Sequence, residues 1–311
     1  HALKNKGVAI VYISHRMEEV FAHCDTITVM RDGYAISSKP TRETNMEQVV
    51  RDMVGRSITE YYPGRTNEPG EIVLEVKNFC QDGLFNNISF KLRKGEILGV
   101  AGLMGAGRTE IMRALFGVDS CKHGEVYLHG KKVCIKKPED AIKAGIGFIT
   151  ENRKSEGLIL DFSISRNIAL PSVDTFAKRS VINAKNETAF SEALSKKLGV
   201  KTASIDLEAG ALSGGNQQKV VIAKWIGMNP SIIIMDEPTR GIDVGAKRDI
   251  YDLMNELTSQ GVAIIMVSSE LPEVIGMSDR ILVIHEGKIA GELDHEEATQ
   301  EKIITLATGG Q

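Results

Sequence analysis

The sequence of 311 residues contains only four cysteines and no long apolar run. Cys24, Cys80, Cys121 and Cys134 show no C-x-x-C spacing, so the sequence favours neither a zinc site nor a disulfide framework and is typical of a reducing compartment. The longest apolar runs, such as Val8–Ile13, fall far below the roughly 20 residues that span a bilayer, and no signal peptide is recognisable. We therefore expect a globular chain that is cytosolic or bound to a membrane protein from the cytosol.

An excess of positive charge is also missing. The 38 Lys and Arg residues are balanced by 41 Asp and Glu residues, which gives a net charge of −3, and the basic residues are dispersed along the chain. Proteins that bind nucleic acid by its phosphates need a basic surface. The composition therefore predicts no nucleic-acid partner, and the length allows one large domain or two ordinary ones.

The stretch Leu212–Lys247 carries the densest set of chemical groups. Ser213, Gly214 and Gly215 stand just ahead of Asn216–Gly227, which has helix-forming composition. Because the backbone N–H groups at a helix N-terminus favour an anion, this run predicts a phosphate site. Taken alone, the same run is equally compatible with a plain helix cap.

Two acidic residues follow the apolar run Ser231–Met235. The run is too short for a core helix and predicts a central parallel strand that is buried on both faces. Asp236 and Glu237 would then lie at the carboxyl end of this strand, where ligands bind in open α/β sheets. Such a pair can divide the work, one acid holding Mg²⁺ and the other orienting an attacking water. The alternative is that the pair merely opens the next helix.

A glycine-rich loop follows the apolar strand pattern Glu96–Ala101. The loop runs from Gly102 to Thr109 with the sequence GLMGAGRT, and a helical pattern covers Glu110–Phe116. This order of strand, loop and helix is the context that a phosphate-binding loop requires, with the Thr109 hydroxyl available to Mg²⁺. Arg108 stands where the pattern G-x-x-x-x-G-K-[ST] has lysine, and its planar guanidinium does not replace a compact ammonium.

Together these motifs resemble the P-loop, signature motif, Walker B strand and D-loop of ATP-binding-cassette (ABC) ATPases. Asp236 lies 23 residues after Ser213, and the sequence GIDVGAK follows closely. The runs GLMGAGRTE, LSGGNQQK, TRGIDVGAK and VSSE are similar to the two-cassette ATPase subunit of bacterial monosaccharide importers of the ribose, galactose and xylose type. The resemblance implies an α/β P-loop NTPase fold with a mixed, mainly parallel core sheet, an antiparallel β subdomain and an inserted helical subdomain.

The resemblance also implies ATP and Mg²⁺ as ligands, with Glu237 catalytic and Mg²⁺ held by Thr109 and Asp236. It implies further nucleotide contacts from Gly102, Gly105, Ala106, Gly107, Arg108, Thr109, Glu110, Glu151, Ser213, Gly214, Gly215, Asp243 and Ser269. In that family two cassettes close head to tail, so each ATP lies between the Walker motifs of one cassette and the signature of the other. The signature of this chain would thus serve a different ATP from its P-loop.

Three positions depart from the catalytic pattern of the family. Arg108 replaces the lysine, Glu151 stands where a Mg²⁺-sensing glutamine is found, and Ser269 stands where a γ-phosphate-sensing histidine is found. We therefore expect the P-loop to bind nucleotide but to support hydrolysis poorly. No aromatic residue for stacking on adenine is evident after Val76, and Phe85 is expected to pack in the core.

An internal repeat organises the chain. Gly7–Gly33 aligns without gaps to Gly261–Gly287 with 11 identities in 27 positions, and the alignment places His15 opposite Ser269. His15 would therefore be the catalytic switch histidine of the site that the signature serves. We interpret the sequence as an N-terminally truncated piece of a two-cassette protein, with the end of the first cassette at 1–56, a linker at 57–70 and a complete second cassette at 71–311, whose helical lobe covers about 161–227.

The repeat also predicts local structure. Each copy should form a strand, a short helix, a second strand and a hairpin, and the first strand of the N-terminal copy is expected at Val8–Ile13. The segment Asn152–Asp161 resembles the groove in which the cytoplasmic helix of a permease docks, although an ordinary solvated loop would look similar.

The resemblance implies transmembrane permease subunits as partners, a periplasmic sugar-binding protein as an indirect partner, and the remaining part of the first cassette. It implies a peripheral location on the cytoplasmic side of the inner membrane. Two alternatives remain within the same fold. A tandem-cassette protein acting on the ribosome would have a long basic helical linker, and a DNA-repair ABC ATPase would have a coiled coil between P-loop and signature. The sequence shows neither feature.

The P-loop glycines generate the first prediction. The chain should bind Mg-ATP, and Gly107→Val should abolish this binding because the new side chain occupies the space that a phosphate must approach. Titration with a fluorescent ATP analogue measures the effect. Equal binding by the variant and the wild type would show that this loop is not the site.

Overall fold

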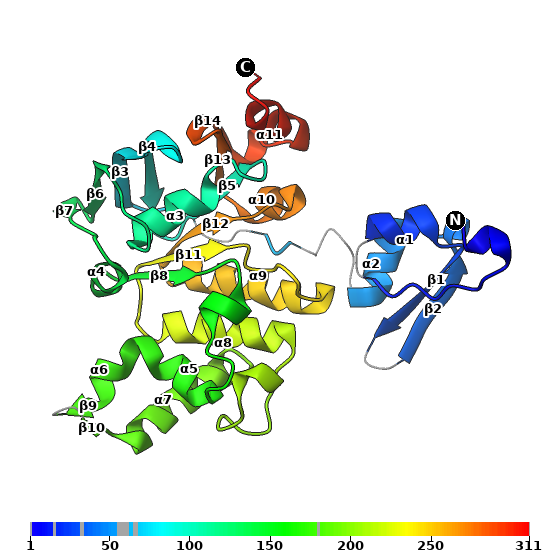
Figure 1. Ribbon diagram of the computed structural model, residues 1–311, viewed down its shortest axis with the longest axis horizontal. Coiled ribbons are helices and arrows are strands. Elements are labelled where there is room, and N and C mark those ends of the chain that lie inside the picture. Colours follow the sequence, from blue (N-terminus) through cyan, green and yellow to red (C-terminus); the bar gives the residue numbers. More distant parts are fainter. Residues whose placement is uncertain are drawn as a thin grey trace.

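The computed structural model describes most of the chain, and its elements are labelled in Figure 1. The described residues are 2–14, 17–31, 34–54, 62–64, 68–178 and 181–310.

The core is a six-stranded sheet built mainly from buried aliphatic residues. Its strand order is β14-β13-β5-β12-β11-β8, and every neighbouring pair is parallel except the antiparallel pair β13–β14. The apolar runs form central strands because helices pack against the sheet and exclude water from it. The bounds are β5 Ile97–Gly102, β8 Ile146–Ile149, β11 Ile232–Asp236, β12 Ala263–Val267, β13 Arg280–His285 and β14 Lys288–Asp294.

Helices that follow individual strands cover this sheet. The P-loop helix α3 (Arg108–Phe116) packs against β5, β8 and β11, and α9 (Val244–Ser259) packs against β12. Both α10 (Leu271–Met277) and α11 (Gln300–Ala307) pack against β5. The short helix α4 (Pro138–Lys143) leads into β8. The carboxyl ends of β5, β11 and β12 therefore meet at one edge, to which the motif loops are attached.

A second sheet is antiparallel, with the order β4-β3-β6-β7. Buried and exposed residues alternate along β4, which shows that one face of this sheet packs on the core and the other does not. Phe85 is 4% exposed and its ring stacks on that of Phe79, which confirms the prediction that it packs in the core. The bounds are β3 Ile72–Gln81, β4 Phe85–Arg93, β6 His123–Leu128 and β7 Lys131–Val133.

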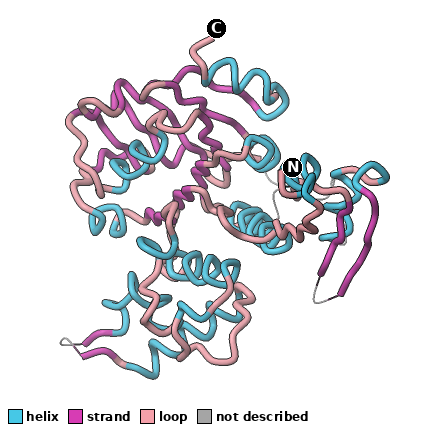
Figure 2. Tube along the Cα trace, turned by 45° about the vertical axis from the view of Figure 1, so that its right-hand side comes forward, coloured by secondary structure: helices cyan, strands magenta, loops and turns pink. Residues whose placement is uncertain are grey.

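A helical subdomain lies beside the core sheet, as the lower part of Figure 2 shows. It contains a short hairpin, β9 (Ala177–Lys178) with β10 (Val181–Ile182), which the sequence did not predict. Two-residue strands leave no detectable period in a sequence. The helices are α5 Ile164–Ala169, α6 Val173–Phe176, α7 Ala184–Lys197 and α8 Gly214–Ile226.

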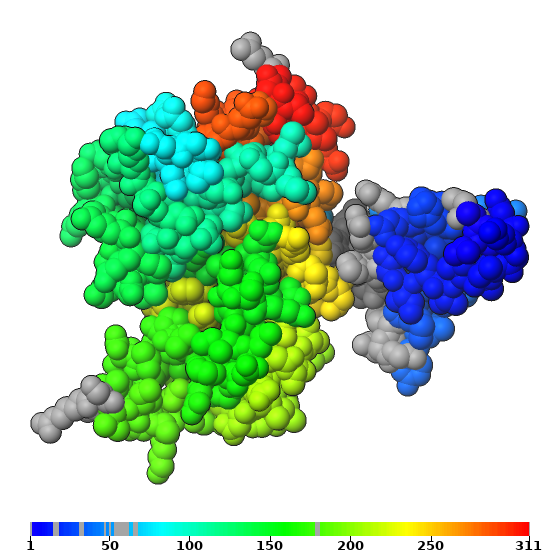
Figure 3. Space-filling model, in the orientation of Figure 1, coloured from blue at the N-terminus to red at the C-terminus, as the bar shows by residue number. Residues whose placement is uncertain are grey.

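The N-terminal residues form a small separate lobe, shown in blue in Figure 3. The hairpin of β1 (Thr26–Arg31) and β2 (Tyr34–Pro40) packs with α1 (Met17–His23) and α2 (Met46–Val54). A cluster of four buried side chains, Val20, Ile27, Val29 and Val49, holds these elements together.

The prediction of a strand at Val8–Ile13 is wrong for this structure. The segment forms no regular strand, and the side chains of Val11 and Ile13 are 90% and 93% exposed. Its repeat counterpart β12 is buried between β5 and β11, whereas no strand among the described residues pairs with residues 8–13. A β-strand needs neighbours for its backbone hydrogen bonds, so an apolar run alone does not produce one.

Gly99 in the middle of β5 generates a stability prediction. A Cβ atom there would lie 2.3 Å from Ser278 Oγ and 2.9 Å from Val274 Cγ1, because α10 packs closely on the strand. Gly99→Ala should therefore lower the free energy of unfolding by about 1 to 3 kcal/mol, the usual cost of overpacking a core. Denaturant unfolding measures it. At Gly64 an added Cβ would meet nothing within 4 Å, so Gly64→Ala is the matched control. An equal effect of the two substitutions would contradict the packing argument.

Candidate functional site

The glycine-rich loop joins β5 to α3 at the carboxyl edge of the core sheet. Gly102 has a φ of 154°, and a Cβ there would lie 2.4 Å from the Ile284 carbonyl oxygen. Gly107 has a φ of 98°, and a Cβ there would lie 3.3 Å from the Leu84 carbonyl oxygen. The loop is thus held between β13 and the turn before β4, with a backbone that side chains rarely allow.

The first turn of α3 follows directly from this loop. Arg108, Thr109 and Glu110 form that turn, and Ala106 just before it is buried. The first N–H groups of a helix have no partner within the helix, so those of α3 are available to an anion at its amino end. Gly105 lies one residue before Ala106, and a Cβ atom there would meet nothing within 4 Å. The loop therefore leaves space for a ligand.

Asp236 is the last residue of β11 and is 1% exposed. Both its carboxylate oxygens are buried, and neither has a hydrogen-bond partner of normal geometry among the described residues. Burial raises the pKa of Asp236 to about 6, although the neighbouring Thr109 and Arg108 side chains act in the opposite direction. A buried carboxylate without partners is costly, which points to a ligand that would satisfy it.

This arrangement fits Mg²⁺ bound together with a nucleotide. No cluster of three or more His, Cys, Asp or Glu side chains that could hold a metal is found in the part of the chain that the structure describes. Mg²⁺ does not need such a cluster, because it is commonly bound through one or two carboxylates together with substrate phosphates. Asp236 with its two open oxygens and the adjacent Thr109 hydroxyl are residues of the right type.

Glu237 lies next to Asp236 in an unusual backbone conformation, with a φ of 49°. Its N–H donates to the Val267 carbonyl oxygen at 2.8 Å, which fixes the turn after β11 to the end of β12. Burial raises the pKa of the Glu237 carboxyl to about 7, with Ser269 and Arg108 opposing this shift. A carboxyl group with a pKa near 7 is suited to exchanging a proton at neutral pH.

Two of the three residues that depart from the family pattern, Arg108 and Ser269, lie close to Glu237. The Ser269 hydroxyl donates to Glu237 Oε2 at 3.1 Å, and Arg108 Nη2 lies 3.9 Å from Glu237 Oε1. Arg108 Nη1 also donates to the Ser268 carbonyl oxygen at 2.8 Å. The Arg108 side chain is therefore held by the loops after β11 and β12, across the space in front of the P-loop.

Glu151, the third residue that departs from the family pattern, lies in the loop after β8. Its side chain is 40% exposed and forms an ion pair with Arg240. Asp243 caps α9 by accepting a hydrogen bond from the Ala246 N–H at 3.0 Å. In this structure both carboxylates are bound to protein groups in the loop regions beside the motif residues.

The signature residues lie at the amino end of α8 in the helical subdomain. We predicted that Ser213, Gly214 and Gly215 precede the helix, but α8 already begins at Gly214, with Ser213 as its N-cap. The Ser213 hydroxyl accepts a hydrogen bond from the Asn216 side chain at 3.0 Å instead of from the helix backbone. The predicted catalytic residue His15 lies outside the described residues.

Sequence reasoning missed a buried carboxylate behind the site. Glu273 of α10 is 1% exposed and accepts hydrogen bonds from the Thr239 hydroxyl, at 2.6 Å, and from the Ser268 hydroxyl. It thereby joins the loop after β11 to the loop after β12. Glu273 stands in an ordinary amphipathic helix pattern, so the sequence offers no signal for this role.

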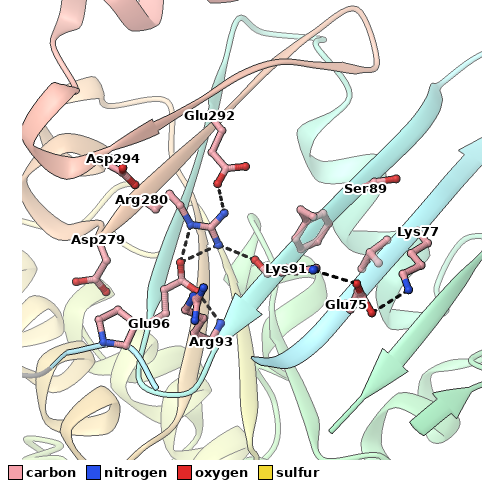
Figure 4. A pocket seen from close by; sticks show the side chains of 13 residues that line it. Glu75, Lys77, Ser89, Lys91, Arg93, Glu96, Asp279, Arg280, Glu292 and Asp294 are labelled. Atoms are coloured by element: carbon pink, nitrogen blue, oxygen red, sulfur yellow. Dashed lines mark hydrogen bonds and ion pairs between the residues drawn. The ribbon is translucent and has the colours of Figure 1, made fainter. Parts of the chain in front are cut away.

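A cavity of about 790 Å³ lies away from these motifs and is shown in Figure 4. It is placed at the amino ends of β5 and β13, opposite the edge that carries the P-loop. Arg280 there donates to Glu96 at 2.9 Å and to the Lys91 carbonyl oxygen at 2.7 Å, and it pairs with Glu292. These contacts join β4, β13 and β14. None of the predicted site residues lines this cavity.

A second cavity, about 260 Å³, lies beside the segment that follows Glu151. Phe116, Phe148 and Trp225 form its apolar wall, and the half-buried Lys224 donates from its ammonium to the Gly157 carbonyl oxygen at 2.9 Å. Burial lowers the pKa of Lys224. This cavity combines aromatic surface with a half-buried amine and opens next to Arg153–Gly157, a single turn of π-helix.

A family model described as "ABC transporter" matches residues 85–240, which is half of the chain. The ribose import ATP-binding protein RbsA of Bacillus licheniformis is 61% identical over 310 residues, and that of Oceanobacillus iheyensis is 62% identical over 308 residues. These matches cover 100% and 99% of this chain but 63% and 62% of the relatives. The chain thus spans less than two thirds of their length.

Solved structures show the same fold at low identity. An ATP-binding cassette of an ABC transporter, MJ1267 in its ADP conformation, superposes with a TM-score of 0.64 at 23% identity, covering 76% of this chain and 99% of that one. The cassette MJ0796, a dimer bound to ADP and Pi, superposes with a TM-score of 0.61 at 22% identity, covering 71% and 98%. The predicted fold class, a cassette with a mixed core sheet, an antiparallel sheet and added helices, is confirmed.

The raised pKa of Glu237 generates a prediction for the nucleotide-free chain. Between pH 4.5 and about 7 the folded chain retains a proton that the unfolded chain has lost, so the free energy of unfolding should fall as the pH rises through this window and then level off. Each pKa unit corresponds to about 1.4 kcal/mol. Asp236 acts in the same direction.

Urea unfolding across this pH range measures the effect. Glu237→Gln cannot ionise and should show a flatter profile, whereas the exposed Glu192 on α7 allows Glu192→Gln as a control that keeps the wild-type slope. If Glu237→Gln kept the full slope, the Glu237 carboxyl would not titrate as its burial implies.

Proposed function

This chain belongs to the ABC transporter family, and from that premise we propose that it is an ATP-binding motor component of an importer for ribose or a related monosaccharide. The name of the closely similar RbsA proteins supports the substrate class. The observation that carries the ATP site is the buried Asp236 carboxylate, which has no hydrogen-bond partner of normal geometry among the described residues and lies beside Arg108 and Thr109 of α3. The chain would contribute to two ATP sites, one through its P-loop and one through its signature.

In the P-loop site, the backbone N–H groups at Gly105–Thr109 would receive the phosphates of ATP. Asp236 and the Thr109 hydroxyl would hold Mg²⁺, which neutralises phosphate charge when bound. Glu237 would orient the attacking water and accept its proton, consistent with a pKa near 7. The signature of a second cassette would close this site over the nucleotide.

Several contacts favour binding over turnover in the P-loop site. Arg108 must leave the Ser268 carbonyl and Glu237 before it can contact a phosphate. Its guanidinium is also bulkier than the lysine ammonium that the motif normally supplies. Ser269 reaches Glu237 through a short hydroxyl and offers no imidazole to a γ-phosphate. We propose that this site holds ATP and hydrolyses it slowly.

The signature site would behave differently. Ser213, Gly214 and Gly215 at the start of α8 would contact the ATP held by another P-loop, with the helix N-terminus supplying N–H donors. His15 would serve this site as the switch residue, on the basis of the repeat. We therefore propose that most ATP turnover occurs at the signature site.

The groove beside residues 152–161 is the proposed docking surface for a permease. Its aromatic wall and the half-buried Lys224 fit an apolar helix end that carries a carboxylate. None of the helices described in this chain is long and apolar enough to cross a bilayer. Attachment through this groove would place the protein at the cytoplasmic face of the membrane, with a periplasmic sugar-binding protein as an indirect partner. Neither the fold nor the comparisons favour the ribosome-binding alternative.

The two-site proposal predicts unequal effects in the assembled transporter. Ser213→Arg and His15→Ala should remove most of the ATPase activity, because loss of a contact to developing charge costs about 100- to 1,000-fold at a site that turns over. Glu237→Gln should leave a substantial fraction, because its site contributes little. Steady-state phosphate release distinguishes these outcomes. Equal loss in all three variants would show that both sites are catalytic.

A further inference from the structure

We propose that Arg153 is a positioning residue that couples the segment after β8 to both ATP sites. It lies in the π-helical turn Arg153–Gly157, beside the proposed docking groove. Its guanidinium contacts the loop after β11 and also lies against the first residue of α8. The contacts themselves are independent of the proposed function, whereas their consequence for transport rests on it.

The guanidinium binds two successive peptide carbonyls. Arg153 Nη1 donates to the Arg240 carbonyl oxygen at 2.7 Å, and Nη2 donates to the Gly241 carbonyl oxygen at 3.1 Å. Two parallel N–H donors on adjacent carbonyls fix the orientation of that stretch of backbone, which a single donor cannot do. Because the loop begins at Glu237 and ends at the α9 cap, Asp243, these bonds restrain the link between the catalytic carboxylate and α9.

The same guanidinium lies against the signature. A Cβ atom at Gly214 would lie 2.8 Å from Arg153 Nη2 and 3.2 Å from the Gly241 carbonyl oxygen. Gly214 is the first residue of α8, directly after Ser213. Arg153, Gly241 and Gly214 therefore converge at one point, where the absence of a side chain on Gly214 leaves room for the guanidinium.

Burial makes this contact more consequential than the neighbouring ion pair. The Nε atom of Arg153 is buried with no hydrogen-bond partner among the described residues, and burial lowers the pKa of the guanidinium. The ion pair of Glu151 with Arg240 joins the same two loops but is 40% and 63% exposed, so solvent screens it. Of these two links, the one through Arg153 is therefore less screened by solvent.

The coupling role of Arg153 follows from this geometry. A displacement of residues 152–157 by a docked partner would move the guanidinium, and with it the Arg240–Gly241 backbone and the start of α8. The loop after Glu237 belongs to the P-loop site and Ser213 to the signature site. One side chain would therefore transmit docking to both sites. Lysine cannot replace it, because one ammonium does not span two carbonyls and the Gly214 contact.

Amide hydrogen exchange of the 311-residue chain tests the coupling. Arg153→Ala should speed exchange by about tenfold in residues 239–243, because the hydrogen bonds to the Arg240 and Gly241 carbonyls are lost. It should also speed exchange in residues 213–217, because the guanidinium that lies against Gly214 is removed. Arg153→Lys should restore only part of the protection. Lys154→Ala, at the exposed neighbouring position, should leave both segments unchanged. An effect confined to 151–157, or full rescue by lysine, would overturn the proposal.

A second measurement separates this inference from the proposed function. In the assembled transporter, Arg153→Lys should lower the ratio of sugar-stimulated to basal ATP turnover while the KM for ATP stays close to wild type. An unchanged ratio would overturn the transport role of Arg153. Absence of ATP binding by the wild-type chain would instead refute the proposed function and leave the exchange result intact.

Discussion

Burial of two adjacent carboxyl groups at the end of β11 is the constraint on which the rest of the site depends. Asp236 and Glu237 lie at the end of an apolar strand between β8 and β12, so their charges are poorly solvated and the pKa values of both are raised. Such an arrangement is unfavourable unless a cation or a proton is present. In the proposed function this place would take Mg²⁺, and the glycine-rich loop beside it would supply N–H groups to the accompanying phosphates.

Arg108 provides part of the missing positive charge when no nucleotide is bound. Its guanidinium lies near Glu237 and is held by the Ser268 carbonyl, which lessens the electrostatic cost of the buried acids. The same contacts place it where a nucleotide must compete with the protein for the side chain. A single substitution in the P-loop can thus make the resting site more stable and the reactive state harder to reach.

The loops at the carboxyl edge are joined by side chains that no motif identifies. Glu273 holds the loops after β11 and β12 together from within the core, and Arg153 joins the segment after β8 to the loop after β11, beside the first residue of α8. Through these hydrogen bonds, a displacement of one loop would act on the others. Coordinated movement of this kind is what a motor that transmits a docking event to its ATP sites requires.

The sequence alone determined the cassette fold, the P-loop and the acidic pair, because apolar strand runs and the glycines and carboxylates that follow them are local in the chain. It also predicted most helices and strands, since their periodicity is local too. Tertiary structure decided the features that depend on contacts between segments distant in the sequence. Val8–Ile13 has the composition of a strand but no strand beside it among the described residues, and the partners of Arg108, Glu151, Arg153 and Glu273 come from segments distant in sequence. Such contacts leave no periodic signal, because they arise only when the strands are placed side by side.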